Sequence, residues 1–360
     1  MSKFLFFPHV PYHANTFCKV INILNEHDSI IIYSDHLKKY QLKLDGDSNI
    51  KSIAKKNNVK TLPYHPSILF DEKPDAVIVM CDWGGWPKRM IEDAKSMNIP
   101  TIGHVEGAQD YLDTHIEDGY VTKRRYPYSR VDFIFSLGDY DKQFFLNKKI
   151  ITTGSPRFDS FTESKNITTV KNDVAINCNF SYGLYSDIAL GWIGDIVSQV
   201  NSLSLKYKIS QHIGDCTDLS SYNTADYGIY ELINESKILI SRFSTVIIEG
   251  LLLGRPVIYY NPHGEKQPTF LESLGSFPTP KTKIDLKKSI EDVMINPEKW
   301  LERSKDFLDL HVGYYNGGSS ERFAKELIRV GQLRSNIIRK FLFRSNIIFN
   351  MNKIFKNFHD

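Results

Sequence analysis

Long apolar runs, paired cysteines and a large charge excess are all missing from this sequence. No stretch reaches about 18 uninterrupted apolar residues, which argues against a membrane-spanning helix. The four cysteines are far apart and form no CxxC pair, so neither a zinc site nor a disulfide framework is indicated, and reduced thiols in a cytosolic protein are expected. The formal net charge is +3, which is too small to predict nucleic-acid binding by the whole molecule.

What the sequence does contain is typical of a globular α/β protein with two domains. Its 360 residues are 41% hydrophobic and 24% charged, and the chain is too long for one ordinary core. The N-terminus holds one lysine and a short apolar run that Pro8 interrupts, which indicates a first strand rather than a secretion signal. Short β-branched runs then alternate with amphipathic segments through both halves, a pattern that predicts parallel sheets covered by helices on both faces.

These patterns predict a fold of two Rossmann-like, doubly wound domains that face a central cleft. We expect a first domain over 1–154, a polar hinge over 155–172 and a second domain over 173–330. In open parallel sheets, ligands bind beyond the carboxyl ends of the strands, so both sets of loops are expected to line the cleft.

A basic, aromatic-rich tail occupies residues 331–360. Six Lys or Arg residues and one acid give it a charge of +5, which leaves −2 for the rest of the chain. Because its apolar residues are too many for one narrow helical stripe, we expect the tail to lie on an anionic membrane surface. The alternative is an ordinary C-terminal helix packed on the body with a solvated basic face.

The segment from Lys237 to Tyr260 predicts a strand, a turn and a buried helix. Ser244 is placed to cap the amino end of the helix, and Gly254 to end it. Free N–H groups and a positive dipole end, with the hydroxyls of Ser244 and Thr245 beside them, suit phosphate oxygens. Glu249 is a lone carboxylate on an otherwise apolar helix and could accept hydrogen bonds from two sugar hydroxyls, or lie at the rim of an ordinary buried helix.

Four segments together resemble the GT-B glycosyltransferases, in particular bacterial surface-polysaccharide enzymes of the CDP-glycerol glycerophosphotransferase and capsule sugar transferase types. The resemblance extends over roughly residues 100–325, and the first hundred residues add no known signature. Its segments are S-T-x-x-x-E-G-L-L-L-G-R-P-V-I from Ser244, T-G-S-P-R-F-D over 153–159, Q-H-I-G-D over 211–215 and G-Y-Y-N-G-G-S-S-E-R over 313–322. Two departures are Ile213, where the family has proline, and Asn316, where it has aspartate.

The resemblance implies which residues bind the donor. The serine and threonine loops of these families contact the donor phosphates and the glutamate contacts the ribose, while a histidine stabilises the leaving phosphate. In this sequence, the resemblance implies that His212 stabilises the leaving phosphate. It implies that the donor is bound by Ser244, Thr245, Glu249, Ser319, Ser320 and Arg157. A surface histidine in a turn is the alternative interpretation of His212.

The same resemblance makes the first domain, 1–154, the acceptor-binding domain and the second, 173–330, the nucleotide-donor-binding domain. The acceptor-binding domain is expected to supply a base that deprotonates the acceptor hydroxyl. Gly103–Asp110 follows a predicted strand, and His104 and Glu106 are the candidates within it; the glycine after Glu106 marks a tight turn that favours the carboxylate. A polar loop with locally capped acids is the alternative. Further acceptor-side candidates, from this loop and from the segment after the first strand, are His9, His13 and Asp110.

Two other features of the first half admit more than one interpretation. The run Asp82-Trp-Gly-Gly-Trp86 follows a strand, and its indoles could stack on sugar rings or pack in the core. Asp139 and Asp141 have a spacing used for metal-nucleotide binding, but a helix cap is the better interpretation of Asp139.

We therefore expect a metal-independent transferase without a resident cofactor. It would move a sugar or a polyol-phosphate from a nucleotide-activated donor to a lipid-linked or oligosaccharide acceptor of a growing surface polysaccharide: capsule, lipopolysaccharide or wall polymer. We expect it in the cytoplasm, peripheral on the inner face of the membrane. The alternatives are a nucleotide-sugar epimerase or hydrolase of the same fold, and a non-catalytic subunit of a glycan-assembly complex. Donor base, acceptor and stereochemical outcome remain open.

Overall fold

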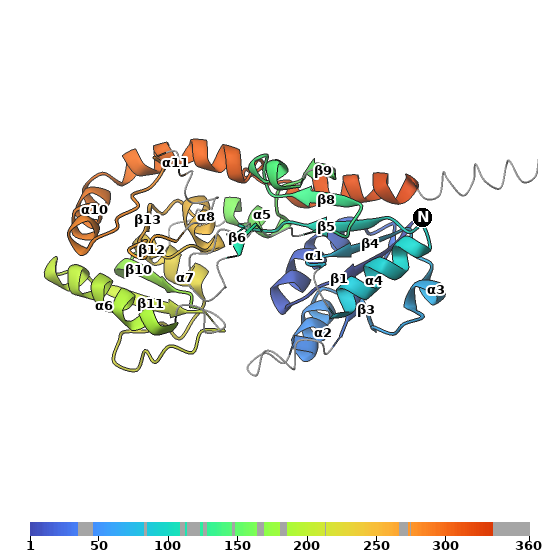
Figure 1. Cartoon of the computed structure of the whole chain (residues 1–360), viewed down its shortest axis with the longest axis horizontal. Helices are drawn as coiled ribbons and strands as arrows, with labels where there is room; N and C mark the ends of the chain where they lie inside the picture. The colour runs from blue at the N-terminus through green and yellow to red at the C-terminus, as the bar shows by residue number, and fades with distance from the viewer. Residues whose placement is uncertain are drawn as a thin grey trace, which may run out of the picture.

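Two parallel sheets divide the chain into two domains, which confirms the predicted fold class (Figure 1). The structure is a computed structural model, and it describes residues 1–34, 46–82, 85–108, 112–113, 123–124, 128–145, 148–163, 169–180, 186–212, 214–265, 273 and 275–333.

The first sheet runs in the order β3-β2-β1-β4-β5-β8-β9, and every adjacent pair is parallel. Its central strands are apolar throughout because helices cover both faces of the sheet. The strands are β1 (Lys3–Phe7), β2 (Asp28–Tyr33), β3 (Lys60–Pro63), β4 (Ala76–Val79), β5 (Thr101–His104), β8 (Phe133–Ser136) and β9 (Lys149–Thr152). A separate antiparallel pair consists of β6 (Leu112–Asp113) and β7 (Lys123–Arg124).

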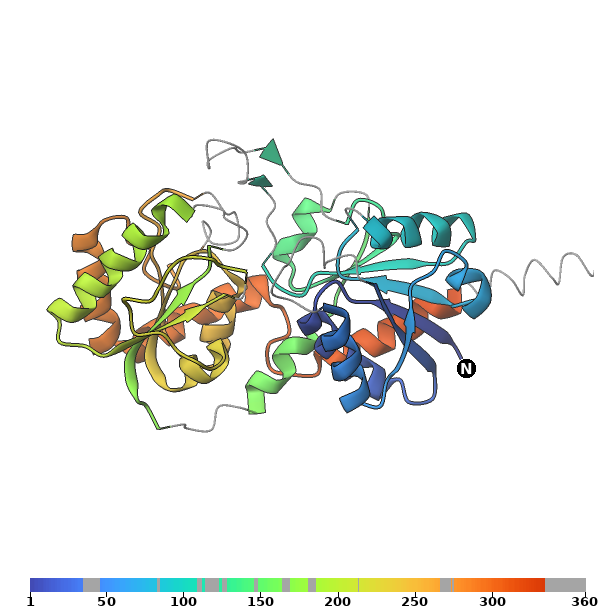
Figure 2. The same ribbon diagram turned by 90° about the horizontal axis from the view of Figure 1, so that it is seen from below.

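Helices pack on both faces of the first sheet, as Figure 2 shows. One face lies against α3 (Ile68–Glu72) and α4 (Gly85–Ser96), and the other against α1 (Pro11–Ile23) and α2 (Gly46–Lys56). The sheet separates two cores, and alternate residues of β1 point into each of them. Leu5 and Phe7 face α3 and α4, and Phe4 and Phe6 face α1 and α2.

The second sheet is smaller and runs β11-β10-β12-β13, again with parallel pairs. Its strands are β10 (Asn172–Cys178), β11 (Tyr207–Gln211), β12 (Ser236–Ser241) and β13 (Val257–Tyr259). One face packs on α6 (Ser186–Ser202) and α10 (Lys283–Ile295), and the other on α7 (Ile229–Asn234) and α8 (Thr245–Leu252). The long helix α11 (Pro297–His311) follows, and its Phe307 lies in the core that contains α7 and α8.

In its described residues, the predicted hinge contains short helices and lies between the two domains. It holds the short 3-10 helix η3 (Pro156–Phe158) and then α5 (Asp159–Glu163). Another 3-10 helix, η2 (Tyr140–Phe144), meets the end of α11, where the ring of Tyr140 lies 4.2 Å from that of His311. The contact between η2 and α11 therefore connects the two domains in addition to the chain crossing itself.

The helix formed by residues 319–333 returns to the first domain, which differs from the predicted donor-domain boundary at 330. Its buried side chains join the core beneath the first sheet; they are Phe323, Ala324, Leu327 and Val330. The rest of the predicted tail, 334–360, lies outside the described residues. Within the described part, no helix is both long and apolar enough to cross a membrane.

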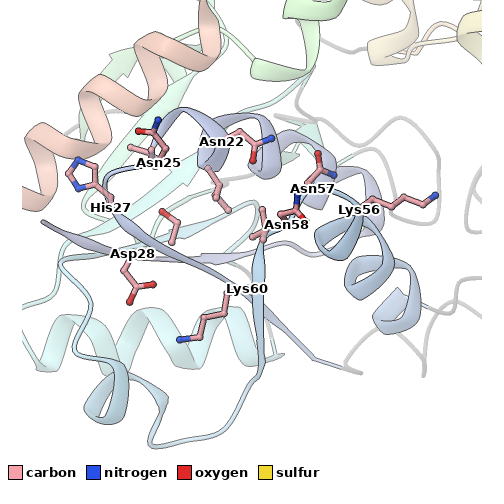
Figure 3. Close-up of a pocket in the computed structure, with 12 residues that line it drawn as sticks. Asn22, Asn25, His27, Asp28, Lys56, Asn57, Asn58 and Lys60 are labelled. Atoms are coloured by element: carbon pink, nitrogen blue, oxygen red, sulfur yellow. The ribbon is translucent and has the colours of Figure 1, made fainter.

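A hollow of about 650 Å³ lies at the far end of the first domain, where α1 and α2 end and β2 and β3 begin (Figure 3). Its rim is made largely of turn residues such as Asn25 and Asn58, and Asn58 has the positive φ of 56° that commonly ends a helix. Since ligands of doubly wound sheets bind at the opposite, carboxyl edge, this hollow is not our candidate site.

Candidate active site

The amino end of α8 has the geometry predicted for an anion-binding turn. After β12 the chain extends at Ser244, whose Oγ accepts the backbone N–H of Val246 at 3.2 Å. This is an N-cap, and it leaves Ser244 and Thr245 only half-buried at the positive end of the helix. The helix ends at Leu252, and Gly254 follows with a φ of +71°, so the predicted limits of the helix are confirmed.

The loop after β5 of the first domain touches the same helix end. The backbone N–H of Ala108 donates to Thr245 Oγ1 at 3.2 Å. A Cβ atom at Gly107 would lie 2.6 Å from that hydroxyl oxygen, so the close approach of the two domains requires glycine at this position. The carboxyl edges of the two sheets therefore meet beside the start of α8.

Glu106 lies in this loop and is paired with His13 at the start of α1. His13 Nε2 is 3.0 Å from Glu106 Oε1, and both side chains are largely buried. His13 Nδ1 accepts the backbone N–H of His9 at 3.1 Å, so the ring hydrogen is on Nε2 and points to the carboxylate. His9 also places Nδ1 3.5 Å from Cys81 Sγ. Three acceptor-side candidates, His9, His13 and Glu106, are thus brought together.

The carboxyl group of Glu106 is held ionised. Burial alone would raise its pKa, but the electrostatic effects of the nearby His13 and Arg157 and the hydrogen bond from His13 outweigh burial and lower the pKa to about 2. Its second oxygen, Oε2, is buried and accepts no hydrogen bond from the described residues. A buried carboxylate oxygen of this kind calls for a donor, which a substrate hydroxyl can supply.

Arg157 connects this carboxylate to one from the other domain. Its Nη1 lies 3.8 Å from Glu106 Oε1, while its Nη2 forms an ion pair with Glu249 of α8. The hydroxyl of Tyr230, on α7, donates to the same Glu249 oxygen at 2.9 Å. Burial raises the pKa of Glu249, against the lowering effects of Arg157 and of the Tyr230 hydrogen bond. Glu249 is only 2% exposed, so in this structure it serves the domain junction and does not face a ribose site.

Ser319 and Ser320 bind a carboxylate of the same chain, that of Asp159. Their backbone N–H groups donate to the two oxygens of Asp159 at 2.9 and 2.8 Å, and Ser320 Oγ donates to Asp159 at 2.5 Å. The amino end of the helix 319–333 thus binds the carboxylate that ends the T-G-S-P-R-F-D segment. Both serines are buried, so here they fasten the hinge to the C-terminal helix and do not form an open donor-phosphate site.

His104 lies in the core of the first domain. Its side chain is completely buried, with Nδ1 3.3 Å from the carbonyl of Phe135 and the ring edge against Phe323. Burial lowers its pKa to about 4, so the ring is neutral near pH 7. Of the two candidate bases, Glu106 is the one whose side chain contacts Arg157 at the junction.

His212 follows β11 at the carboxyl edge of the second sheet. Its Nδ1 accepts the backbone N–H of Gly214 at 3.0 Å, which leaves the ring hydrogen on Nε2. Burial lowers the pKa of His212, so the neutral, donating form dominates near pH 7. The neighbouring Asp215 has a structural role, because it accepts the backbone N–H groups of Phe180 and Thr217.

Some predicted residues cannot be placed, and one contributor was not predicted. Asp110 and Ile213 lie outside the described residues. Tyr230 joins the junction although no motif singled it out; only its position on a short helix facing Glu249 reveals it. Among the described residues, no group of three or more His, Cys, Asp or Glu side chains is arranged to hold a metal ion.

A family model matches part of the second half of the chain, and curated relatives match about a third of its length. The family described as CDP-Glycerol:Poly(glycerophosphate) glycerophosphotransferase matches residues 202–329. Teichoic acid ribitol-phosphate polymerase TarK of Staphylococcus aureus is 29% identical over 132 residues, 36% of this chain and 24% of its own length. Teichoic acid ribitol-phosphate primase of Bacillus spizizenii is 34% identical over 105 residues, 28% of this chain and 27% of its own length. The matches thus span about a quarter of the length of these relatives.

Solved structures match nearly the whole chain. UDP-GlcNAc 2-epimerase from Neisseria meningitidis, bound to UDP-GlcNAc, has a TM-score of 0.63 at 15% identity and covers 91% of this chain and 100% of its own. The wall teichoic acid polymerase TagF, an H444N variant soaked with CDPG, has a TM-score of 0.56 at 14% identity and covers 95% and 90%. At such identities the likeness shows the fold alone. The chain therefore has the GT-B fold, and its residues 202–329 carry the sequence signature of the CDP-glycerol glycerophosphotransferase family.

Proposed function

We propose that this protein transfers a polyol-phosphate from a nucleotide-activated donor to a growing bacterial wall polymer. One observation carries the proposal: an ionised, half-satisfied carboxylate of the first domain lies beside a capped helix start of the second. That helix start is part of residues 202–329, which match a glycerophosphotransferase family. The matched family and the teichoic acid relatives favour polyol-phosphate over sugar, and wall polymer over capsule or lipopolysaccharide.

The donor would bind at the second domain with its phosphates at the start of α8. The positive dipole end, the free backbone N–H groups and the hydroxyls of Ser244 and Thr245 suit phosphate oxygens. His212 would add a neutral Nε2–H donor to the departing phosphate. These groups are the reason to propose transfer without a metal ion, and chelation with EDTA is expected to leave the rate unchanged. A loss of activity in EDTA that added Mg²⁺ restores would contradict transfer without a metal ion.

The acceptor hydroxyl would donate its hydrogen to Glu106 Oε2. As the hydroxyl oxygen bonds to the donor's distal phosphorus, the bond from that phosphorus to the bridging oxygen breaks, and a nucleoside monophosphate leaves with that oxygen. A carboxylate with a pKa of about 2 is a weak base, so its main contribution is to orient the hydroxyl and to take its proton late. Phosphoryl transfer of this kind depends mostly on positioning and charge stabilisation.

The test measures nucleoside monophosphate release with CDP-glycerol and CDP-ribitol as donors. We expect release from one of them, dependent on an acceptor, and a loss of about 100-fold or more in kcat for Glu106→Gln. An unchanged kcat would remove Glu106 from the reaction. No release from either donor, with UDP-GlcNAc converted instead, would favour the epimerase alternative, whose members share the fold over the whole chain.

We also propose that the protein works at the cytoplasmic face of the membrane. The basic, aromatic tail 331–360 is the supporting observation, because clusters of Lys and Arg with aromatic residues bind anionic lipid. Deleting 334–360 is expected to abolish sedimentation with phosphatidylglycerol vesicles and to leave transfer to a water-soluble acceptor intact. Undiminished sedimentation of the shortened chain would contradict a role for the tail.

A further inference from the structure

Three aromatic rings form a stack at the carboxyl edge of the first sheet. The ring of Phe7, the last residue of β1, lies parallel to that of Tyr64, with centroids 5.7 Å apart and an interplanar angle of 9°. Trp86, at the start of α4, lies next to Tyr64, with ring centroids 4.9 Å apart and an interplanar angle of 32°. The three rings come from segments that follow β1, β3 and β4, so the sheet itself assembles them.

The stack is buried at one end and exposed at the other. Phe7 is 2% exposed, whereas Trp86 is 36% exposed. The residues that anchor α4 in the core are Pro87, Met90, Ile91 and Ala94, so Trp86 is not needed to bury this helix. The hydroxyl of Tyr64 is buried and has no hydrogen-bond partner among the described residues, a cost that phenylalanine would avoid if packing were the only role of the ring.

The stack lies at the same sheet edge as the proposed reaction site. Two residues after Phe7, the backbone N–H of His9 donates to His13, whose ring is paired with Glu106. Strand β1 is separated from β5, which precedes Glu106, by β4 alone, so these two strands are about 10 Å apart. Tyr64 follows β3, two strands beyond β1, so an acceptor that meets Glu106 would have to extend along the carboxyl edge of the sheet to reach the indole.

We propose that Trp86, backed by Tyr64 and Phe7, is an acceptor subsite for a hexopyranose ring. The inference rests on the proposed function and names its acceptor class: a sugar-bearing acceptor and not a purely linear polyol-phosphate. A pyranose ring has a rigid face of C–H groups and a rim of hydroxyls, which match an exposed indole surface set in a polar edge. A linear polyol-phosphate has no such fixed face, and its charges gain nothing from an indole.

A binding experiment tests the subsite without reference to transfer. Saturation-transfer NMR with a panel of methyl hexopyranosides is expected to show contact to the ring C–H protons of at least one of them. The signal should fall about tenfold in Trp86→Ala and be largely kept in Trp86→Phe. Phe70→Ala is the matched control, because Phe70 is an aromatic side chain of the same domain, 68% exposed and outside the stack. No signal, or equal loss in the Phe70 and Trp86 variants, would overturn the proposal.

A kinetic experiment separates this inference from the proposed function. With CDP-glycerol or CDP-ribitol as donor, Trp86→Ala is expected to raise the KM for a sugar-terminated acceptor about tenfold, with kcat and the donor KM unchanged. An unchanged KM for the sugar-terminated acceptor in Trp86→Ala would overturn the subsite and leave the transferase intact. Absence of any transfer would count against the proposed function, while the NMR result would still decide the subsite.

Discussion

At the scale of single residues, the junction consists of charges that stabilise one another. Glu106 and Glu249 come from different domains, and Arg157 lies between them with contacts to both. Buried ion pairs of this kind add little net stability when complete, but they are costly when one partner is removed. Their value is in specifying a single arrangement, here the one that holds Glu106 ionised beside α8.

The lowered pKa of Glu106 makes stability depend on acid pH. Because the pKa falls from 4.5 in the unfolded chain to about 2 in the folded one, its contribution is complete above about pH 4.5 and is lost as the pH falls toward 2. The contribution at neutral pH is roughly 3 kcal/mol by this linkage. Urea unfolding of Glu106→Gln is expected to show a shallower fall between pH 4.5 and 2 than wild type. Glu291→Gln, at an exposed position, should match wild type; equal slopes for all three proteins would contradict the shift.

Removing one partner of the buried pair should destabilise the fold. Glu249→Gln leaves Arg157 with only the longer contact to Glu106, and we expect a loss of about 3 kcal/mol in the free energy of unfolding. Glu302→Gln, which removes an exposed ion pair with Lys305, should cost less than about 1 kcal/mol. Urea titrations at pH 7 compare them, and losses of equal size would show that the junction pair has no special role.

At the scale of elements, the start of α8 combines two tasks that a substitution can separate. Ser244→Ala removes the cap and is expected to cost about 1 kcal/mol. Ser244→Asp keeps a capping oxygen, so stability should be retained. Its negative charge should nevertheless weaken binding of a nucleoside diphosphate at least tenfold, because it competes for the same helix dipole.

Calorimetric titration with CDP, alongside thermal unfolding, measures both effects. Ala and Asp variants that bind CDP as tightly as wild type would show that phosphates do not lie at this turn. The proposed donor site would then have to move to another strand end of the second domain.

At the scale of the whole molecule, the helix 319–333 ties the two domains together. Its serines hold Asp159 of the hinge, while Phe323 is fully buried against the first sheet. Phe323→Ala is expected to lower the free energy of unfolding by about 3–5 kcal/mol. Because the lost contacts belong to the first core, hydrogen exchange should accelerate in β5 and β8 and stay unchanged in β10 and β12. Acceleration confined to the second sheet would contradict the packing described above.

The local pattern of the sequence determined most of the elements. Alternating strands and helices predicted two doubly wound domains. The strands of a parallel sheet are buried on both faces, so each is a nearly continuous apolar run that the sequence alone reveals. The cap at Ser244 and the end near Gly254 were also predictable, because both depend on neighbouring residues alone. The motifs around residues 153–159 and 313–322 marked two segments that contact each other in the structure.

Only the tertiary structure decided what those marked residues touch. Sequence spacing could not show that Asp159 occupies the helix start at Ser319, or that Glu249 faces Arg157 and Tyr230. It also could not distinguish Glu106 at the junction from His104 in the core, two positions away. The physical reason is that ion pairs and burial join residues far apart in the chain, and their partners are set by how the two sheets and the final helix pack, not by any local pattern.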